Sequence, residues 1–425
     1  MSYNYTRHRL LDGIYYNSVI DSKFKSNTLT IKFIVPLEAK DFLLNCFAIA
    51  TVSETNSKYP TIAKMSKRLQ ELYGSGIGYS FKSFADLQIL TLQANWIDDL
   101  YTFDEEDITK SMVDILVDCI FNPYLVNGDL HAETFNIIKN ELTDSIENQI
   151  NNKRHYAVTQ ANKTIFAGEP AQYCIYDDRG LVREITSKQV LNRLNTLINT
   201  ANIEIFYVGR EDKPYVQEQF TKAFSTLDNR TVQPFPKSAK SVAKSTVAEL
   251  SESMDVNQTK LIMAFKTDCS NRHANIVMHA ILGLTPTSKL FANVREKLSL
   301  CYYCQSSIDN TKGVLYIDSG IEPKNYEQSK QAILQQVEDL KDGNFSEHDV
   351  DEAITYISNS LKSLGDVHAD YVSWYLTDIV HGLNRTLDSE LEKFHKVTKP
   401  QIVQSAKALV LDTIYTLNPL DRKEQ

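Results

Sequence analysis

The chain has 425 residues, of which 42% are hydrophobic and 23% are charged, as in an ordinary soluble globular protein rather than a disordered or fibrous one. Its 45 Lys and Arg against 54 Asp and Glu give a net charge of −9, which opposes binding to nucleic acid or to an anionic membrane. We expect two or more domains at this length. The opening residues lack an apolar run after a basic start, and no apolar stretch reaches the roughly 18 residues of a membrane helix. We therefore predict a cytoplasmic protein.

The first half of the chain begins with a strand and two helices. Alternate residues from Leu29 to Val35 in TLTIKFIVP are apolar, which predicts a strand with one face more buried. The apolar run DFLLNCFAIATV follows as a helix, with Asp41 as its expected N-cap. A second helix, IAKMSKRLQELYG, ends at Gly74 and leads into the alternating strands IGYSFKSF and LQILTLQA.

The second half repeats this order. The strand KLIMAFK precedes the helix RHANIVMHAILG, for which Gly283 is the expected stop. The helix SKLFANVREKL then leads into the strands CYYCQSSID and VLYIDSGIE. Both halves also end in the same way: Thr186 and Thr398 each begin a predicted helix that is followed by a strand. The repetition predicts a duplicated α+β unit, with an antiparallel sheet and helices packed on one face.

These patterns place the domain boundaries near the middle of the chain. Residues 229–246 are rich in Pro, Ser and Lys and show no apolar period, as expected of a linker. The predicted domains are therefore residues 1–228 and 247–425, joined by this segment.

Six cysteines are scattered along the chain without a secretion signal: Cys46, Cys119, Cys174, Cys269, Cys301 and Cys304. Free thiols are expected from this distribution rather than a disulfide framework. Cys301 and Cys304 form the one C-x-x-C, within a predicted strand, where a spacing of three points side chains to opposite faces. We therefore interpret them as two small core residues.

Histidines do not form a metal-binding pattern. No two of the nine stand four apart with a Glu between them, the arrangement that puts two imidazoles on one helix face beside a general base. His273 and His279 are six apart and would face differently. Acidic clusters around residues 98–107 are interpreted as solvated helix starts, and Ser346 with Asp349 as a helix cap.

Arg295 and Tyr302 are the candidate binding residues. They stand seven residues apart across a helix-to-strand junction, and together they offer a planar fork of donors and a phenol that can hold a peptide carbonyl. The alternative on pattern alone is an Arg extended over its helix and a half-buried strand Tyr.

The repeated unit, the sequence V-R-E-K-x-S-L-x-Y at Val294 to Tyr302 and the segment 135–173 together resemble the insulinase or pitrilysin family. That family includes the mitochondrial processing peptidases and the core subunits of the cytochrome bc1 complex. The resemblance covers essentially the whole chain. It implies two tandem insulinase-like domains in a clam-shell arrangement, with the Arg/Tyr motif in the second.

The family's zinc motif H-x-x-E-H is degenerate in this sequence. Thr55 to Pro60 resembles the end of the segment that follows the zinc helix, and counting back places Cys46 and Ala50 at the two histidines and Ile49 at the glutamate. One thiol cannot replace three ligands and a base. Glu141 stands at or near the third-ligand position. The resemblance therefore implies no bound metal, no cofactor and no catalytic residues.

The resemblance also implies a function. Many members of the family work in pairs, in which one subunit supplies zinc and a non-catalytic partner supplies the Arg and Tyr that contact a peptide or protein substrate. We expect Arg295 and Tyr302 to bind substrate in a heterodimer with a zinc-containing homologue, or in a self-dimer. Among bacterial members, the chain is most similar to a non-catalytic type associated with modification of elongation factor P.

Two other functions stay open at this point. One is a stand-alone scaffold or peptide-binding protein, comparable with the bc1 core subunits. The other is a divergent metallopeptidase that uses Glu141 and distant histidines, which would need ligands that the sequence does not bring together.

Overall fold

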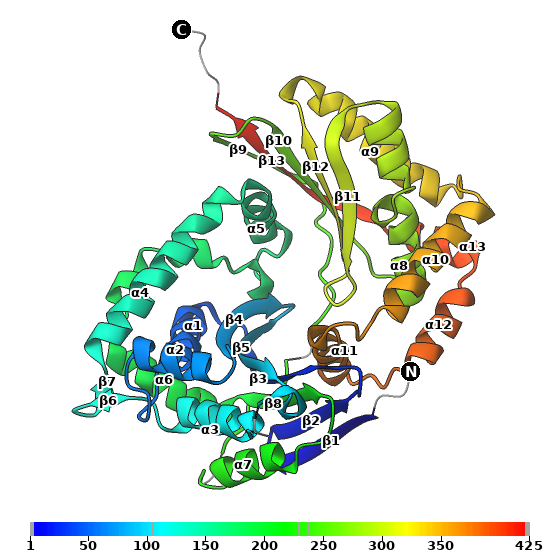
Figure 1. Ribbon diagram of the computed structural model, residues 1–425. Coiled ribbons are helices and arrows are strands. Elements are labelled where there is room, and N and C mark those ends of the chain that lie inside the picture. Colours follow the sequence, from blue (N-terminus) through cyan, green and yellow to red (C-terminus); the bar gives the residue numbers. More distant parts are fainter. Residues whose placement is uncertain (1–3, 104–105, 228–229, 237, 421–425) are drawn as a thin grey trace. The chain divides into compact units, whose positions relative to one another are not determined.

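The computed structural model describes residues 4–103, 106–227, 230–236 and 238–420. They form two compact units, each discontinuous in sequence (Figure 1). Unit 1 contains the described residues of 1–147, 175–236 and 365–382, and unit 2 those of 148–174, 238–364 and 383–420. Each unit therefore includes a short segment from the opposite half of the chain.

Unit 1 is built on a six-stranded sheet of order β1-β2-β8-β3-β5-β4. Its strands are β1 (Asn4–Leu11), β2 (Ile14–Ile20), β3 (Ser26–Pro36), β4 (Gly76–Phe84), β5 (Leu87–Ile97) and β8 (Asn202–Gly209), with a small separate pair, β6 (Leu125–Val126) and β7 (Asp129–Leu130). Its helices are α1 (Ala39–Glu54), α2 (Ile62–Glu71), α3 (Ile108–Phe121), α4 (Ala132–Glu147), α6 (Ser187–Thr200), α7 (Pro214–Phe224) and α11 (His368–His381). All strand pairs of this unit are antiparallel except β2 with β8.

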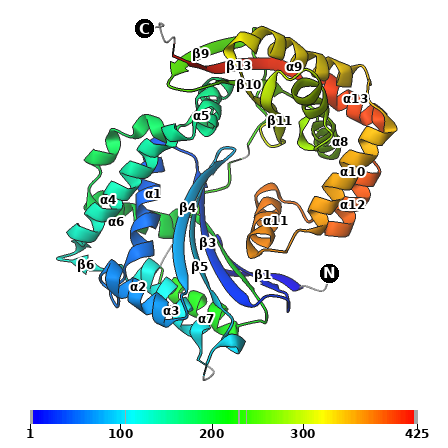
Figure 2. The ribbon, with the colours of Figure 1, turned by 45° about the horizontal axis from the view of Figure 1, so that its top comes forward.

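Helices lie on both faces of this sheet (Figure 2). On one face α1 packs against β4 and β5. On the other face Ile34 and Ile89 belong to a buried cluster with Tyr371 and Leu376 of α11. The ring of Tyr375 also stacks on Tyr5, with centroids 3.5 Å apart. The segment 365–382 is thus an integral part of unit 1.

Unit 2 is built on a five-stranded sheet of order β11-β12-β10-β13-β9. Its strands are β9 (Ala248–Met254), β10 (Thr259–Lys266), β11 (Cys301–Asp309), β12 (Val314–Ile321) and β13 (Val410–Pro419). Its helices are α5 (Lys153–Ile165), α8 (Arg272–His279) with its continuation η6 (Ala280–Leu284), η7 (Leu290–Lys297), α9 (Tyr326–Lys341), α10 (Glu347–Lys362), α12 (Leu387–His395) and α13 (Lys399–Lys407). Helix α5 packs on β10 and β13.

The two sheets share one topology. The order β2-β8-β3-β5-β4 in unit 1 matches β9-β13-β10-β12-β11 in unit 2, and in both the first pair of strands is parallel and the others antiparallel. This correspondence confirms the duplicated α+β fold that the sequence predicts, although in unit 1 helix α11 also covers the second face of the sheet.

Several expected helix caps are present, and the predicted N-cap of the first helix is wrong. Thr186 and Thr398 both form capping boxes, and so does Ser346 with Asp349. Asp41, however, lies in the first turn of α1, whose N-cap is Glu38, because the helix begins before the apolar run. Within the described part of the chain, no helix has the length and apolarity needed to cross a membrane.

Candidate functional site

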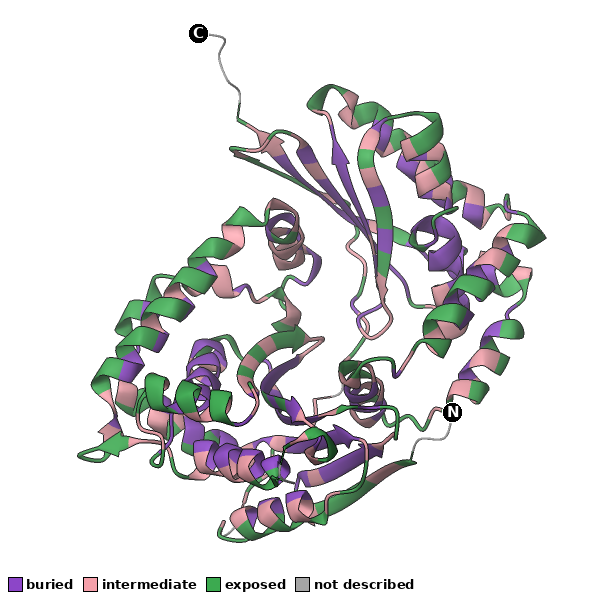
Figure 3. Cartoon of the chain, in the orientation of Figure 1, coloured by how far each residue is buried: buried purple, intermediate pink, exposed green. Residues whose placement is uncertain are grey.

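Helix α1 carries the degenerate zinc positions, and all three are sealed inside unit 1. Cys46 and Ile49 are each 1% exposed and Ala50 is fully buried. In Figure 3, at the place that Figure 1 labels α1, most of the helix is coloured as buried. Side chains such as Ile and Ala can be packed this tightly because they bury no polar atom. The side chains that bind a catalytic zinc, in contrast, must leave an open position for water or substrate. These positions now serve packing.

A chain of polar side chains closes the same helix against β5. Gln88 is fully buried, and its Nε2 donates to Cys46 Sγ at 3.5 Å and to the Phe42 carbonyl at 3.1 Å. Asn45 Nδ2 donates to Gln88 Oε1 at 2.6 Å, and Arg193 Nε donates to Asn45 Oδ1 at 2.5 Å. The buried amide groups of Asn45 and Gln88 therefore both have hydrogen-bond partners, as buried polar groups generally do.

Zinc does not fit the residues of α1. Burial raises the pKa of the Cys46 thiol well above its ordinary value, so the thiolate that binds metal is disfavoured. Ile49 and Ala50 offer no donor atom. Among the described residues, no group of three or more His, Cys, Asp or Glu side chains is placed to hold a metal ion.

Glu141 on α4 lies near Glu54, the last residue of α1. Burial and then the charge of Glu141 raise the pKa of Glu54, and the same order of causes raises the pKa of Tyr79 on β4. The neighbourhood thus contains Glu54, Tyr79 and Glu141. Only the two carboxylates are of a type that zinc ordinarily takes from a protein, which is fewer than the three protein ligands of a catalytic site.

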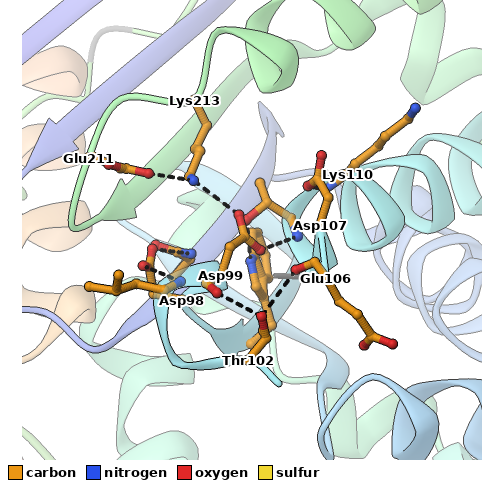
Figure 4. A network of polar contacts seen from close by, with 12 residues as sticks. Asp98, Asp99, Thr102, Glu106, Asp107, Lys110, Glu211 and Lys213 are labelled. Atoms are coloured by element: carbon orange, nitrogen blue, oxygen red, sulfur yellow. Dashed lines mark hydrogen bonds and ion pairs between the residues drawn. The ribbon is translucent and has the colours of Figure 1, made fainter. Parts of the chain in front are cut away.

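The acid-rich turn before α3 caps helical turns as the sequence predicts (Figure 4), but Asp98 is buried rather than solvated. Asp98 is buried and accepts a hydrogen bond from the Leu100 amide. Asp99 accepts from the Thr109 amide and pairs with Lys213 at 3.0 Å. Asp107 caps α3 by accepting from the Lys110 amide. Residues 104 and 105 of this cluster lie outside the described residues.

Arg295 lies on η7 with its side chain 41% exposed. Its guanidinium lies over the ring of Phe291 at 4.8 Å and 3.7 Å from a Glu296 carboxylate oxygen. Both neighbours are on the same helical segment, and an exposed pair at that distance contributes little energy. The donors of Arg295 are therefore free to bind a ligand at little cost.

Tyr302 lies at the start of β11 and is 57% exposed. Its hydroxyl donates to Glu322 Oε1 at 3.4 Å. Because β11 is the outer strand of its sheet, no strand of the described part of the chain lies beside Tyr302 on that side. Arg295 and Tyr302 thus lie on adjacent elements and both present polar groups to solvent, without making each other their partner.

A cavity of about 410 Å³ opens beside Arg295. Its lining comes from the end of η6, the turn that follows, η7 and β11: Gly283, Leu284, Thr285, Pro286, Ser288, Phe291, Arg295, Tyr303, Cys304, Gln305 and Ser306. The wall combines apolar surface with a cation, hydroxyls and an amide, as ligand pockets commonly do.

The wall of this cavity is anchored by a buried hydrogen bond between helix and strand. His279 Nδ1 lies 2.8 Å from Ser306 Oγ, and burial lowers the pKa of His279 to about 4. Gly283 follows, and a Cβ there would lie 2.6 Å from the Ser306 amide nitrogen. Gly283 interrupts the helical backbone inside η6, rather than standing after its end.

On β11, Tyr303 is fixed by charged neighbours. Tyr303 stacks beneath the guanidinium of Arg154 at 4.6 Å and the Lys260 amine at 5.5 Å, while its hydroxyl donates to Asp318 at 3.1 Å. Arg154 also pairs with Asp318. The contacts fix the start of β11 from the side away from the core.

The cysteine pair departs from expectation. All six cysteines are free, but Cys301 and Cys304 do not point to opposite faces. A register shift between Cys301 and Tyr303 inserts one extra residue, Tyr302, against β12. Such a β-bulge moves one side chain to the other face. Both cysteines therefore pack on the buried cluster of unit 2.

Sequence patterns miss most of the cavity. The bulge and the His279–Ser306 bond both join residues far apart in sequence, so no periodicity contains them. The sequence feature that points to this part of the cavity is the isolated C-x-x-C beside Arg295 and Tyr302.

Comparisons with known proteins agree with this fold. Residues 184–357 match the family model described as "Peptidase M16 inactive domain". "Probable inactive metalloprotease YmfF" of Bacillus subtilis (strain 168) is 25% identical over 409 residues, which cover 95% of this chain and 96% of that protein.

Solved structures of similar fold include a conserved protein from Enterococcus faecalis V583, with a TM-score of 0.88 and 24% identity over 99% of this chain and 100% of the other. Another is a peptidase M16 inactive domain from Pseudomonas fluorescens, with a TM-score of 0.80 and 16% identity over the same shares. M16 is the insulinase and pitrilysin family that the sequence resembles. Residues 184–357 thus match an M16 model, and the fold of the whole chain is similar to that of an M16 inactive domain.

Proposed function

We propose that this chain is a non-catalytic, peptide-binding subunit that works in the cytosol with a zinc-bearing homologue. The observation that carries the proposal is the contrast in exposure. The zinc positions on α1 are at most 1% exposed, whereas Tyr302 is 57% exposed and the Arg295 side chain 41%. A chain that kept polar donors at a cavity while packing its metal positions shut is suited to binding and not to hydrolysis.

The exposed groups suit an extended peptide. The guanidinium of Arg295 offers a fork of donors to a carbonyl or carboxylate, and the phenol of Tyr302 adds one more. The outer edge of β11 also offers unpaired backbone groups, to which a peptide can add as a further strand. Gln305 and Ser307 are exposed on the same strand, so side chains and backbone can contribute together.

Hydrolysis needs a second chain. Peptide cleavage of this family's kind depends on a metal that activates water and on a general base, and α1 supplies neither. We therefore expect a homologue with an intact H-x-x-E-H to provide the metal, with this chain holding part of the substrate.

The test is to isolate the native complex and replace the two binding residues. Arg295→Ala and Tyr302→Phe should each lower the partner's kcat/KM by about 10-fold or more, as loss of a hydrogen bond to a charged or polarised group does. Lys297→Ala on the same helix and Tyr356→Phe on α10 are matched exposed controls, and both should leave activity unchanged.

Two results would overturn the proposal. One is chelator-sensitive proteolysis with stoichiometric zinc by the purified chain alone. The other is full partner activity in both binding variants while the complex stays intact, which favours a scaffold. Supplying elongation factor P as substrate to the same complex tests the pathway that the resemblance implies.

A further inference from the structure

The C-x-x-C of β11 is placed as a pair by the bulge. Across the strands, Cys301 is opposite Ile321 and Cys304 is opposite Ser319. Ile321 and Ser319 are two apart on β12, so they share one face, and their cross-strand partners share it too. The two thiols consequently lie side by side on the core face, where a regular strand would have separated them.

The pair is close enough to interact. The Cys304 thiol donates a hydrogen bond to the Cys301 sulfur, and the charge of Arg295 is near Cys301. Positions two apart on one strand face are about 6.6 Å apart at Cα, near the upper end of the Cα separations found in disulfides, about 4.4 to 6.8 Å. A small adjustment of the bulge is sufficient to join them.

The two cysteines are not equivalent. Cys304 is 5% exposed, and its hydrogen bond to Cys301 and then burial raise its pKa well above the ordinary value. For Cys301 the hydrogen bond from Cys304, another with Ser319 and the Arg295 charge together lower the pKa, against the opposing effect of burial. Cys301 is also the more exposed of the two. It is therefore the better nucleophile.

We propose that Cys301 and Cys304 form a peroxide-sensitive thiol pair, in which Cys301 is oxidised first and Cys304 resolves it to a disulfide. The Cys301 thiolate attacks one oxygen of hydrogen peroxide and, with one proton taken up, gives a sulfenic acid and water. The Cys304 sulfur, losing its proton, then attacks the Cys301 sulfur and displaces hydroxide, which leaves as a second water. In sum, two thiols are oxidised to one disulfide and one peroxide is reduced to two waters.

The bond would form at the base of the candidate binding corner. Tyr302 is the extra residue between the two cysteines, and Cys304 lines the cavity with Arg295. In a reducing compartment, such disulfides are transient and serve sensing rather than stability. The proposal stands on the thiol geometry and does not require that the corner bind peptides.

The test uses the full reduced chain treated with hydrogen peroxide. We expect the loss of two alkylatable thiols and an intact mass lower by two hydrogens. Chymotryptic cleavage after Tyr302 or Tyr303 should leave the two cysteine-containing pieces joined until a reductant is added. Before oxidation, alkylation at neutral pH should modify Cys301 ahead of Cys269, and Arg295→Gln should slow the reaction at Cys301.

Variants separate the roles of the two thiols. Cys304→Ser should stop the reaction at a Cys301 sulfenic acid that dimedone traps, and Cys301→Ser should abolish the loss of both thiols. Cys269→Ser, which removes another partly buried thiol of unit 2, should leave the crosslink intact. With circular dichroism showing a folded protein, Cys301 reacting no faster than Cys269, or pieces that never remain joined, would refute the pair.

Discussion

Helix α1 of unit 1, which carries the degenerate zinc positions, and the η7–β11 corner of unit 2, which carries Arg295 and Tyr302, differ in how far their residues are exposed. Eleven of the sixteen residues of α1 are buried, whereas only Leu290 and Val294 are buried among the eight of η7. The helix that resembles the family's metal-bearing helix is packed in the core, whereas the corner exposes polar groups. Changes in α1 should consequently alter stability, and changes in the corner should alter binding.

Restoring a glutamate to α1 should have the largest effect. Ile49→Glu places a carboxylate where the native side chain is 1% exposed, on a helix whose other buried residues carry no positive charge. An unpaired buried charge costs about 3 to 5 kcal/mol. Urea unfolding of the variant should show a loss of that size, or a protein that does not fold.

The matched control is Lys40→Gln on the same helix. Lys40 is exposed and pairs with Glu38 at 3.0 Å on the surface, so its loss should change the free energy of unfolding by less than about 0.5 kcal/mol. An Ile49→Glu protein as stable as this control would show that the position is not sealed. Zinc binding by the Ile49→Glu protein would likewise show that the position is not sealed.

Lowering the pH should have the next largest effect on the free energy of unfolding, because it protonates His279, which bonds to Ser306 in the cavity wall. His279 has a pKa of about 4 in the folded protein against 6.5 ordinarily. Its folded pKa is depressed, so the unfolded chain takes up the proton first, and stability is full above pH 6.5 and falls as the pH drops toward 4. The loss should reach up to about 3 kcal/mol.

His279→Asn isolates this contribution, because the Asn oxygen can accept from Ser306 but does not titrate in this range. The difference in unfolding free energy between the native protein and the variant should shrink as the pH falls from 6.5 to 4. A difference that does not change with pH would assign the acid sensitivity to other groups.

Breaking the polar chain behind Cys46 should have a smaller effect. Gln88→Leu removes the acceptor of Asn45, whose residue is 1% exposed, and a buried unsatisfied donor costs about 1 to 3 kcal/mol. Denaturation of Gln88→Leu, Asn45→Leu and the double variant should show that the double costs less than the sum of the singles. Strict additivity would mean that the two side chains act independently.

Local patterns predicted the strands, the hairpins and the duplication because alternation and turn residues act over a few positions. They could not predict that residues 148–174 and 365–382 join units formed mainly by the opposite halves, since packing between distant segments has no local period. The bulge at Tyr302 could not be predicted from the sequence for the same reason. Its register depends on β12, and one extra residue reversed the expected faces of the two thiols.

The smallest effect on stability is expected at the corner itself. Tyr302→Phe removes one exposed hydroxyl with a 3.4 Å contact, and Arg295→Gln loses a 3.7 Å surface pair. Both should change the free energy of unfolding by less than about 0.5 kcal/mol. Urea unfolding of these variants beside Ile49→Glu would then give the full contrast. A loss of 2 kcal/mol or so in either corner variant would mean that these side chains hold the fold, and the separation between a packed helix and a binding corner would no longer stand.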